Sequence, residues 1–470
     1  MSAPETAASA VRRVREFRQH VLRRRERRDG AGIWERKTLA DVRKVVLILS
    51  APRSGSSLLY ALLKRLPQVY SLSGECVPFY KLNGLASDLF PSDAIPSGER
   101  GAPQRKGLSR DLLSDCGVAG AGKDRSDWGE RFIDELALRL PLQWPRTRFT
   151  YEGIRRAAQD ALAAHRKDSP MFRKEAFHLE LLSRLRTEHP EIDPYYYDLP
   201  AEAVARRFPG LPVPLGPPND VLTIEEPPFI LIEPRREILP QDLDDRTLLL
   251  KSTVNAFRVD YIRSLFPNAD LRAVYLTRNP LASINGLCDG WLYRGFFSHQ
   301  LRAVLEAGPE KRLRIAGYSD RHPWGRWWWN FELPEGWRDY AGRRLEEVCA
   351  FQWLTANRAV QEALKTFSIP SVGLRFEELT DGIAARSGAL RKVCRFMGGD
   401  FNALEGTDLE HLPVVQATRP PDAARWKLRH AAFLPLSRDP RMREMSWAMG
   451  YGTDLETLSR TPGAPEERSA

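Results

Sequence analysis

The sequence has no long hydrophobic run, few cysteines and no recognisable metal motif. In its 470 residues, no segment reaches the roughly 18 apolar residues that a membrane-spanning helix needs. The five cysteines are scattered without a CxxC pair, which argues against a disulfide framework and against a structural zinc site. The eight histidines show neither HxxxH nor HxH spacing, and the carboxylates form no convincing cluster. We therefore predict a protein without a metal site.

Residues 1–10 lack the apolar core of a signal peptide. Together with the missing membrane segment and the missing disulfide framework, this favours a cytoplasmic protein whose thiols are reduced. The formal net charge is +10, and such an excess favours anionic partners. Nucleic acid and a cofactor with several phosphates are both compatible with this charge, so the charge alone does not choose between them.

A loop suited to binding an anion is the most informative feature that is present. Residues 45–49 form a short apolar run, rich in β-branched residues, that predicts a buried parallel strand. Leucines at helical spacing from Leu58 onward predict a helix, so the residues between form a tight turn from strand to helix. In such a turn, backbone N–H groups and the positive end of the helix dipole converge on one point that suits phosphate or sulfate. The residues of this turn are Arg53, Ser54, Gly55, Ser56 and Ser57.

The side chains of this turn fit the same role. Gly55 lets the backbone approach an anion, the three serines add hydroxyl donors, and Arg53 adds a positive charge. No Lys follows Gly55, so the nucleotide-kinase form of the loop, GxxxxGK[ST], is absent. An ordinary serine-rich turn is the alternative interpretation of this segment on its own.

A second strand-like run, residues 271–276, ends at Thr-Arg-Asn-Pro before a helical stretch. Asn279 can cap that helix, and Pro280 suits its first turn. Arg278 is thereby placed at the carboxyl end of the strand, which is the edge at which open α/β sheets bind ligands.

A third segment, residues 418–427, begins with Thr-Arg-Pro-Pro and ends with Trp-Lys. Together the three segments resemble the sulfotransferase superfamily that uses 3′-phosphoadenosine 5′-phosphosulfate (PAPS). The resemblance covers the stretches 45–85, 248–290 and 347–430, in the order of that family. It implies an α/β fold of P-loop type, with a mostly parallel sheet and helices on both of its faces.

The core of this family is compact, so the length of the chain leaves room for an insertion. We expect a basic helix in residues 1–40, and a sulfotransferase domain in residues 41–470 with a large, mainly helical insertion at about 86–247. Residues 86–120 are rich in Gly, Ser, Pro and charge, which predicts a mobile loop. Helical patterns follow this loop, and residues 229–232 predict a short strand.

The resemblance also assigns a donor site. It places the 5′-phosphosulfate on Arg53, Ser54, Gly55, Ser56 and Ser57, and the 3′-phosphate on Arg278 and Arg419.

Three positions depart from the family pattern. Gly286 stands where the family usually has a Ser, and we expect Ser283, one helical turn earlier, to reach the phosphate instead. Phe376 stands at the position of a Tyr, which removes a hydroxyl. Leu58 stands where some cytosolic members stack a Trp on adenine. These changes concern the contacts with adenosine, whereas the arginines that bind anions are retained.

Sulfuryl transfer needs positive donors around the sulfate and a base for the acceptor proton. Arg53 and Lys251 are the candidate cations, and Lys251 ends a strand-like run. A solvated strand end is the alternative interpretation of Lys251. Many cytosolic relatives place a catalytic His two residues after this Lys, but Thr253 stands there.

Another part of the chain offers a base. Ser73-Gly74-Glu75 resembles the "GE" element that protein-tyrosine sulfotransferases and several bacterial ones use, so we predict Glu75 as the general base. A surface carboxylate is the alternative interpretation of Glu75. Glu225 and Glu226 are further candidates to face the acceptor, because they precede the strand predicted at 229–232.

Two unusual segments have two interpretations each. Residues 11–29 predict a helix that is rich in arginine and has one apolar face. Such a helix either docks by its apolar face or binds RNA or an anionic membrane. Residues 323–340 are crowded with aromatic side chains, which either wall an acceptor pocket or pack between the core and the insertion.

These features predict a PAPS-dependent sulfotransferase of secondary metabolism, acting on a hydroxyl or an amine of a small-molecule or natural-product acceptor. One alternative is a P-loop nucleotide phosphotransferase, against which the missing GK[ST] lysine argues. The other is a non-catalytic protein that binds RNA or membranes through the arginine-rich helix. We expect no nucleic-acid partner and no metal cofactor.

Overall fold

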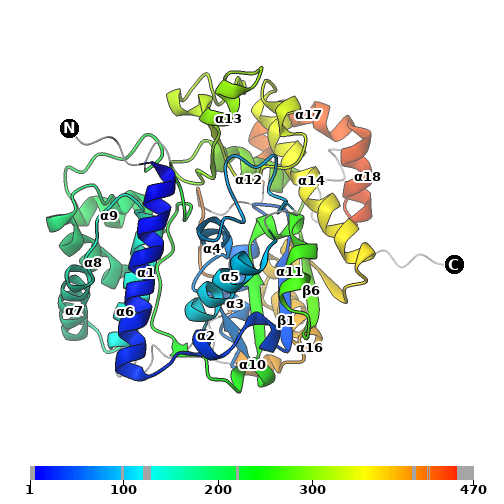
Figure 1. The fold of residues 1–470 in the computed structure, drawn as a ribbon. Coiled ribbons are helices and arrows are strands. Elements are labelled where there is room, and N and C mark those ends of the chain that lie inside the picture. Colours follow the sequence, from blue (N-terminus) through cyan, green and yellow to red (C-terminus); the bar gives the residue numbers. More distant parts are fainter. Residues whose placement is uncertain are drawn as a thin grey trace.

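The structure is a computed structural model that describes residues 6–96, 100–119, 129–218, 222–404, 409–420, 422 and 424–452. Within these residues the chain forms a seven-stranded sheet with the order β4-β3-β2-β5-β1-β6-β9 (Figure 1). Five neighbouring strands are parallel: β1 (Lys44–Leu49), β2 (Val69–Ser71), β5 (Thr247–Lys251), β6 (Asp270–Thr277) and β9 (Ser371–Arg375). The α/β class and the mostly parallel sheet are therefore confirmed.

Strand β1 is central because its side chains are apolar on both faces. Residues 45–49 are buried, and β1 pairs with β5 on one side and with β6 on the other. The register sets Ile48 opposite Lys251 and Leu49 opposite Tyr275. The carboxyl ends of the three strands are thereby level, so the loops that follow them meet at one edge of the sheet.

Helices cover both faces of the sheet, as the sequence predicts. One hydrophobic cluster joins Leu47 and Leu250 to helices α1, α6, α12 and α14, and a second joins Val46 and Ile48 to α3 and α16. The helices are α1 (Ala7–Asp29), α2 (Ile33–Arg36), α3 (Ser56–Leu63), α4 (Val77–Leu82), α5 (Ala102–Asp115), α6 (Glu130–Gln143), α7 (Tyr151–Asp168), α8 (Lys174–Glu188), α9 (Ala201–Arg207), α10 (Asp242–Asp245), α11 (Val259–Leu265), α12 (Pro280–Trp291), α13 (Arg302–Ala307), α14 (Leu345–Thr366), α15 (Phe376–Thr380), α16 (Ile383–Phe396), α17 (His430–Arg438) and α18 (Pro440–Ala448).

The segment between the second and the fifth strand is mainly helical, from α5 to α10. Figure 1 shows α7, α8 and α9 on one side of the molecule, with α1 and α6 between them and the sheet. The segment also adds the short strands β3 (Gly117–Val118) and β4 (Arg236–Glu237), which extend the sheet with antiparallel pairing.

Two local predictions within this segment are wrong. Much of the loop predicted at 86–120 is helix α5, because Leu108, Leu112 and Leu113 share one buried face that the surrounding Gly, Ser and Arg conceal in the sequence. Residues 229–232 are not a strand: only Phe229 makes an isolated bridge, to Tyr197. The ring of Phe229 instead packs against Trp144 and Tyr197 of the insertion.

Helix α1 docks by its apolar face, and several of its arginines are part of the packing. Val14, Val21 and Leu22 are buried. Arg18 Nη1 donates to the carbonyl oxygen of Leu138 at 2.6 Å, and Arg28 pairs with the buried Asp134 at 2.7 Å. Among the described residues, no helix is long and apolar enough to cross a membrane.

Candidate active site

A cavity of about 620 Å³ lies where the loops after β1, β5 and β6 meet. Residues from distant parts of the chain line it, including most of the predicted site. The predicted residues on its wall are Arg53, Gly55, Ser56, Ser57, Glu75, Lys251, Arg278 and Arg419.

The loop after β1 has the shape expected of an anion-binding turn. Arg53 and Gly55 both take positive φ angles, of 62° and 92°, before α3 begins at Ser56. The backbone N–H groups of Leu58 and Leu59 both donate to the carbonyl oxygen of Gly55. A Cβ atom on Gly55 would lie 2.1 Å from the ring of Phe376. Position 55 therefore requires glycine for its conformation and for its packing.

Arg53 and Arg278 lie side by side in this loop region. Arg278 Nη1 donates to the carbonyl oxygen of Arg53 at 3.0 Å, and the Arg278 guanidinium lies 4.6 Å from the centre of the Phe376 ring. Burial and the charge of Arg278 lower the pKa of Arg53 to about 10, and burial lowers the pKa of Arg278. The buried Nε of Arg53 has no hydrogen-bond partner in the described structure. Two adjacent, desolvated guanidinium groups suit an anionic ligand.

Lys251 joins the loop to the predicted base. Its ammonium donates to Ser57 Oγ at 2.9 Å and forms a short ion pair with Glu75 Oε1. Ser252 Oγ donates to the other carboxylate oxygen of Glu75 at 2.7 Å. Three sequence-predicted residues, on helix α3, on strand β5 and in the loop after β2, therefore converge at one point of the cavity wall.

Two predicted residues do not face the cavity. Ser54 and Ser283 are buried, their hydroxyl oxygens lie 3.3 Å apart, and neither lines the cavity. Asn279 caps α12 as expected, since its side chain accepts from the N–H of Ala282. The contact of Ser283 with a phosphate stays a prediction, and in this structure its hydroxyl points to Ser54 instead.

The C-terminal segment closes one side of the cavity. Arg419 is exposed at the wall, which also includes the half-buried Gln416 and Arg425 and the buried Trp426. Gln416 accepts from Ser57 Oγ at 2.8 Å, and its carbonyl oxygen accepts from Arg53 at 2.9 Å. Sequence reasoning missed Gln416, because a lone glutamine in an irregular segment carries no pattern. Arg425 lies inside the segment 418–427 that carries part of the family resemblance, so the sequence could have indicated it.

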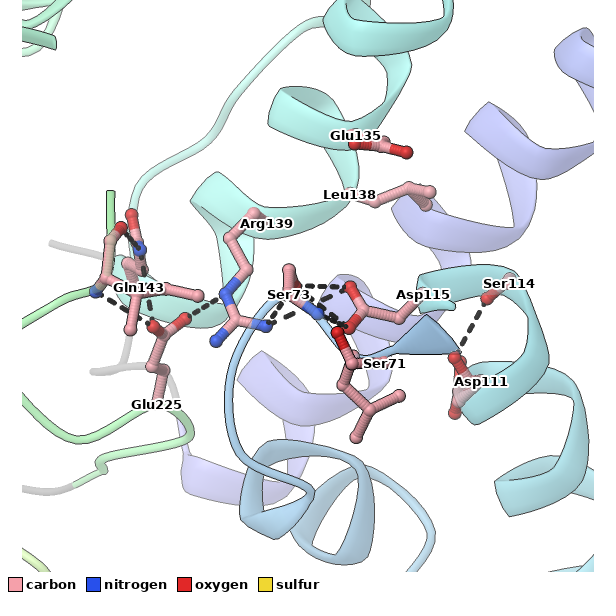
Figure 2. A network of polar contacts seen from close by, with 12 residues as sticks. Ser71, Ser73, Asp111, Ser114, Asp115, Glu135, Leu138, Arg139, Gln143 and Glu225 are labelled. Carbon is pink, nitrogen blue, oxygen red and sulfur yellow. Dashed lines mark hydrogen bonds and ion pairs between the residues drawn. The ribbon is translucent and has the colours of Figure 1, made fainter. Parts of the chain in front are cut away.

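A buried polar network holds the loop that carries Glu75 (Figure 2). Arg139 of α6 forms an ion pair with Glu225 at 2.6 Å and donates to Ser73 Oγ at 3.2 Å. Asp115, at the end of α5, accepts from the N–H of Ser73 at 2.9 Å and from its hydroxyl at 2.8 Å. The position of Glu225 before residues 229–232 predicts that it faces the acceptor. Glu225 does line the cavity, but its carboxylate forms an ion pair with Arg139.

Beyond Glu75 the cavity wall becomes acidic. Glu226 and Glu332 line it, and burial raises their pKa values to about 7 and about 8. His299 lies between Asp88, at 3.4 Å, and Asp93, at 3.6 Å. Burial alone would lower the pKa of His299, but the two carboxylates outweigh it and raise the pKa to about 9. No three His, Cys, Asp or Glu side chains in the described part of the chain are grouped so as to hold a metal ion.

The aromatic segment 323–340 contributes to the cavity through two residues near its middle. Trp328, Trp329 and Trp337 are buried in the core, so packing explains them. Phe331 and Glu332 are the residues of this segment on the cavity wall.

Comparisons with known proteins agree with the sequence motifs. A family model described as the sulfotransferase family matches residues 46–294, more than half of the 470 residues. A comparison with curated proteins finds no match.

The comparison with solved structures matches sulfotransferases at low sequence identity and low TM-score. The sulfotransferase domain from the olefin synthase of Synechococcus PCC 7002 is 17% identical with a TM-score of 0.33, over 87% of this chain and 95% of that one. The sulfotransferase domain from the curacin biosynthetic pathway is 12% identical with a TM-score of 0.37, over 87% and 98%. A sulfotransferase from Alicyclobacillus acidocaldarius is 13% identical with a TM-score of 0.31, over 89% and 99%.

Proposed function

The chain belongs to the sulfotransferase family, and we propose that it transfers a sulfuryl group from PAPS to a hydroxyl group of a small-molecule acceptor. The observation that carries this proposal is the convergence of Ser57, Lys251 and Glu75 at one point of a cavity whose adjoining wall holds Arg53 and Arg278. In-line transfer to a hydroxyl requires a base, a positive charge and a site for the anionic donor. Here a carboxylate, an ammonium and an anion-binding loop lie in contact.

The donor end of the cavity fits a nucleotide with phosphate and sulfate groups. The turn at residues 53–57 would hold the 5′-phosphosulfate with backbone N–H groups, and the unpartnered Nε of Arg53 is a donor that an anion would complete. Arg278 and Arg419 would bind the 3′-phosphate. PAPS, when bound, supplies an activated sulfuryl group.

The residues on the wall have distinct tasks in this proposal. Glu75 takes the proton from the acceptor hydroxyl as the oxygen–sulfur bond forms and the bond between sulfur and the leaving phosphate breaks. Lys251 lies between Ser57 of the loop and Glu75, so its ammonium stabilises charge on the transferring group. Arg53 adds a second fixed cation on the donor side. Glu226 lines the same cavity, and its raised pKa makes it the second candidate for the base.

Two measurements test the proposal. Calorimetry should show that adenosine 3′,5′-bisphosphate binds more tightly than ATP with magnesium, which a nucleotide phosphotransferase would prefer. Incubation with PAPS and metabolite extracts, followed by mass spectrometry, should reveal an acceptor that has gained a sulfuryl group. Tighter binding of ATP, or absence of any PAPS-dependent product, would contradict the proposal. A cytoplasmic location and an acceptor from secondary metabolism stay predictions.

A further inference from the structure

The two ends of the cavity carry opposite charge. Arginines and Lys251 line the donor end, whereas carboxylates dominate the wall beyond Glu75. Most of these carboxylates have a cationic partner. The pairs are Glu75 with Lys251, Glu225 with Arg139 at 2.6 Å, Asp93 with Arg258 at 3.2 Å, and Asp88 with His299 at 3.4 Å.

Glu226 and Glu332 are left without an ion pair in the described structure. Lys81 is the remaining cation on this part of the wall, and its ammonium donates to the carbonyl oxygens of Thr223 at 2.7 Å and Ser298 at 3.1 Å. With both carboxyl groups ionised, two negative charges face one positive charge. The excess is one negative charge.

The carboxyl group of Glu332 is buried and only partly satisfied, since it has a hydrogen bond with Thr253. Its residue is 4% exposed, and its Oε2 atom has no hydrogen-bond partner in the described protein. An unpartnered carboxylate oxygen in such a place costs free energy unless a ligand or a proton completes it. Burial raises the pKa of Glu332, and the neighbouring charges of Asp93 and Glu226 add to the rise. A cation in the cavity would lower the pKa of Glu332 again.

The backbone around Glu332 is fixed, so the carboxylate is held in place. Gln352 Nε2 donates to the carbonyl oxygens of Asn330 at 2.8 Å and of Glu332 at 2.7 Å. Trp329 Nε1 also donates to the carbonyl oxygen of Glu332, at 2.8 Å. The N–H of Phe331 donates to Ser298 Oγ at 2.7 Å, and Phe331 takes a positive φ of 60°. A rigid turn thus presents Phe331 and Glu332 to the cavity.

We propose that Glu332, with Glu226 beside it, forms an anionic subsite that binds a protonated amine of the acceptor. The inference rests on the proposed function and names the class of acceptor: a hydroxyl compound that also carries a basic amine. One ammonium would neutralise the excess charge and give the free carboxylate oxygen a donor. Within the part of the chain that the structure describes, these carboxylates are not grouped with further ligands so as to hold a metal ion, so an organic cation fits them better.

The aromatic residues on the cavity wall next to Glu332 indicate what skeleton the acceptor has. Phe296 and Phe331 are stacked with their ring centres 4.9 Å apart, and the guanidinium of Arg53 lies 4.8 Å from the centre of Phe296. These rings lead from the donor end toward Glu332. A flat, apolar or aromatic skeleton between the hydroxyl and the amine fits this path.

The experiment uses the full chain saturated with adenosine 3′,5′-bisphosphate and two matched pairs of probes. Tyramine is compared with 4-ethylphenol, and 5-aminopentanol with pentanol, because each pair differs only in the amine. Calorimetry should show that the amine binds more tightly in at least one pair, by about ten- to hundredfold, the range of a hydrogen bond to a charged group. Glu332→Gln should abolish this preference and keep the affinity for adenosine 3′,5′-bisphosphate.

The controls separate this inference from the proposed function. Glu335→Gln removes an exposed carboxylate three residues away and should keep the preference. Equal binding within both pairs, or a preference that survives in Glu332→Gln, would overturn the inference. Binding of magnesium or calcium alone that Glu332→Gln abolishes would also overturn it, since a metal ion would then be the ligand. If adenosine 3′,5′-bisphosphate fails to bind but the amine preference is found in the chain without it, the subsite stands and the proposed donor does not.

Discussion

The carboxylate of Glu75 accepts from Lys251 and from Ser252. In a Gln side chain the amide oxygen can still accept from Lys251, and the amide N–H can donate to the Ser252 hydroxyl. Glu75→Gln therefore keeps the shape of the site but cannot accept a proton. We expect turnover to fall by about 10²–10⁴-fold, the usual contribution of general-base catalysis. The affinity for adenosine 3′,5′-bisphosphate, measured by calorimetry, should barely change. Near-normal turnover in a folded variant would show that Glu75 is not the base, and Glu226→Gln would then be the next variant to measure.

Arg278 and Arg419 differ in their surroundings, although we propose that both bind the 3′-phosphate. Arg278→Ala and Arg419→Ala should each weaken binding of adenosine 3′,5′-bisphosphate by about 1.5–3 kcal/mol, since each removes a charged hydrogen bond. Adenosine 5′-phosphosulfate lacks the 3′-phosphate and should lose much less affinity. Arg278→Ala also removes a donor to the loop carbonyl of Arg53, so Arg419→Ala is the cleaner test. Equal losses for both ligands would show that these arginines do not recognise the 3′-phosphate.

The raised pKa of Glu332 predicts how the stability of the protein depends on pH. The pKa of this carboxyl is raised from its usual 4.5 to about 8, and the facing groups are Thr253, Asp93 and Glu226. Between these two values the folded state keeps a proton that the unfolded state has lost, so stability falls as pH rises. Urea titrations at pH 5 and pH 8.5 should show that Glu332→Gln loses less stability over this interval than the parent chain. An identical loss in both proteins would contradict the raised pKa.

Sequence reasoning found the site residues that belong to a motif and missed those that do not. Arg53, Gly55 and Arg278 follow strands at the ligand edge, and that position can be deduced from hydrophobic patterns. Glu332 and Gln416 follow no such pattern. Their places depend on turns with positive φ at Phe331 and Gln416, which local sequence does not specify. The same limit applies to the orientation of Ser283, which points to Ser54.

At the scale of elements, helix α1 shows what a hydrophobic pattern can and cannot predict. Its apolar face predicted docking, which the structure confirms. The partners of its arginines come from other parts of the chain: Arg18 with Asp111, Arg25 with Glu237 and Arg28 with Asp134. Arginines that are buried or paired in this way are not available to RNA or to membranes. The pattern of charge in a single helix could not reveal these partners.

Helix α6 helps to position Glu75 through Arg139. Variants of the ion pair between Arg139 and Glu225 test this role. Arg139→Leu leaves the buried carboxylate of Glu225 unpaired, so we expect a loss of about 3–5 kcal/mol in the free energy of unfolding. It also removes the donor to Ser73 next to the Glu75 loop, so turnover should fall. The double variant Arg139→Leu/Glu225→Leu should recover most of the stability, because the unpaired charge is gone, but should not recover turnover.

Urea unfolding and steady-state kinetics measure the two effects separately. Recovery of turnover together with stability in the double variant would show that Arg139 serves stability alone. Ser73→Ala provides the matched control on the loop, since it removes the hydroxyl that Arg139 and Asp115 share and leaves the buried ion pair intact.

For the whole molecule, the sequence predicted the parallel centre of the sheet and the helices on both faces. It did not predict β3 and β4, because strands of two residues each carry no periodicity. Nor did it predict helix α5, whose apolar residues are few. The central strands are recognisable because they are buried on both faces and hence apolar throughout.

The helical segment between 86 and 247 shares one core with the sheet. Phe132 and Phe177 belong to the same hydrophobic cluster as Leu47 and Leu250, and α1 packs against α6. We therefore propose that the described residues from 41 onward unfold as one unit, although the insertion is large. In increasing urea, hydrogen exchange followed by mass spectrometry should show α7 and β6 losing protection at the same concentration.

Binding of adenosine 3′,5′-bisphosphate gives a second test of whether α7 and β6 unfold together. The ligand would contact only the edge of the sheet, but in a single unit its binding free energy stabilises every part. At one hundred times its dissociation constant it should add about 2.7 kcal/mol to the free energy of unfolding. Protection in α7 and β6 should then shift together to higher urea. A shift confined to β6 would show that the insertion unfolds independently and is a separate domain.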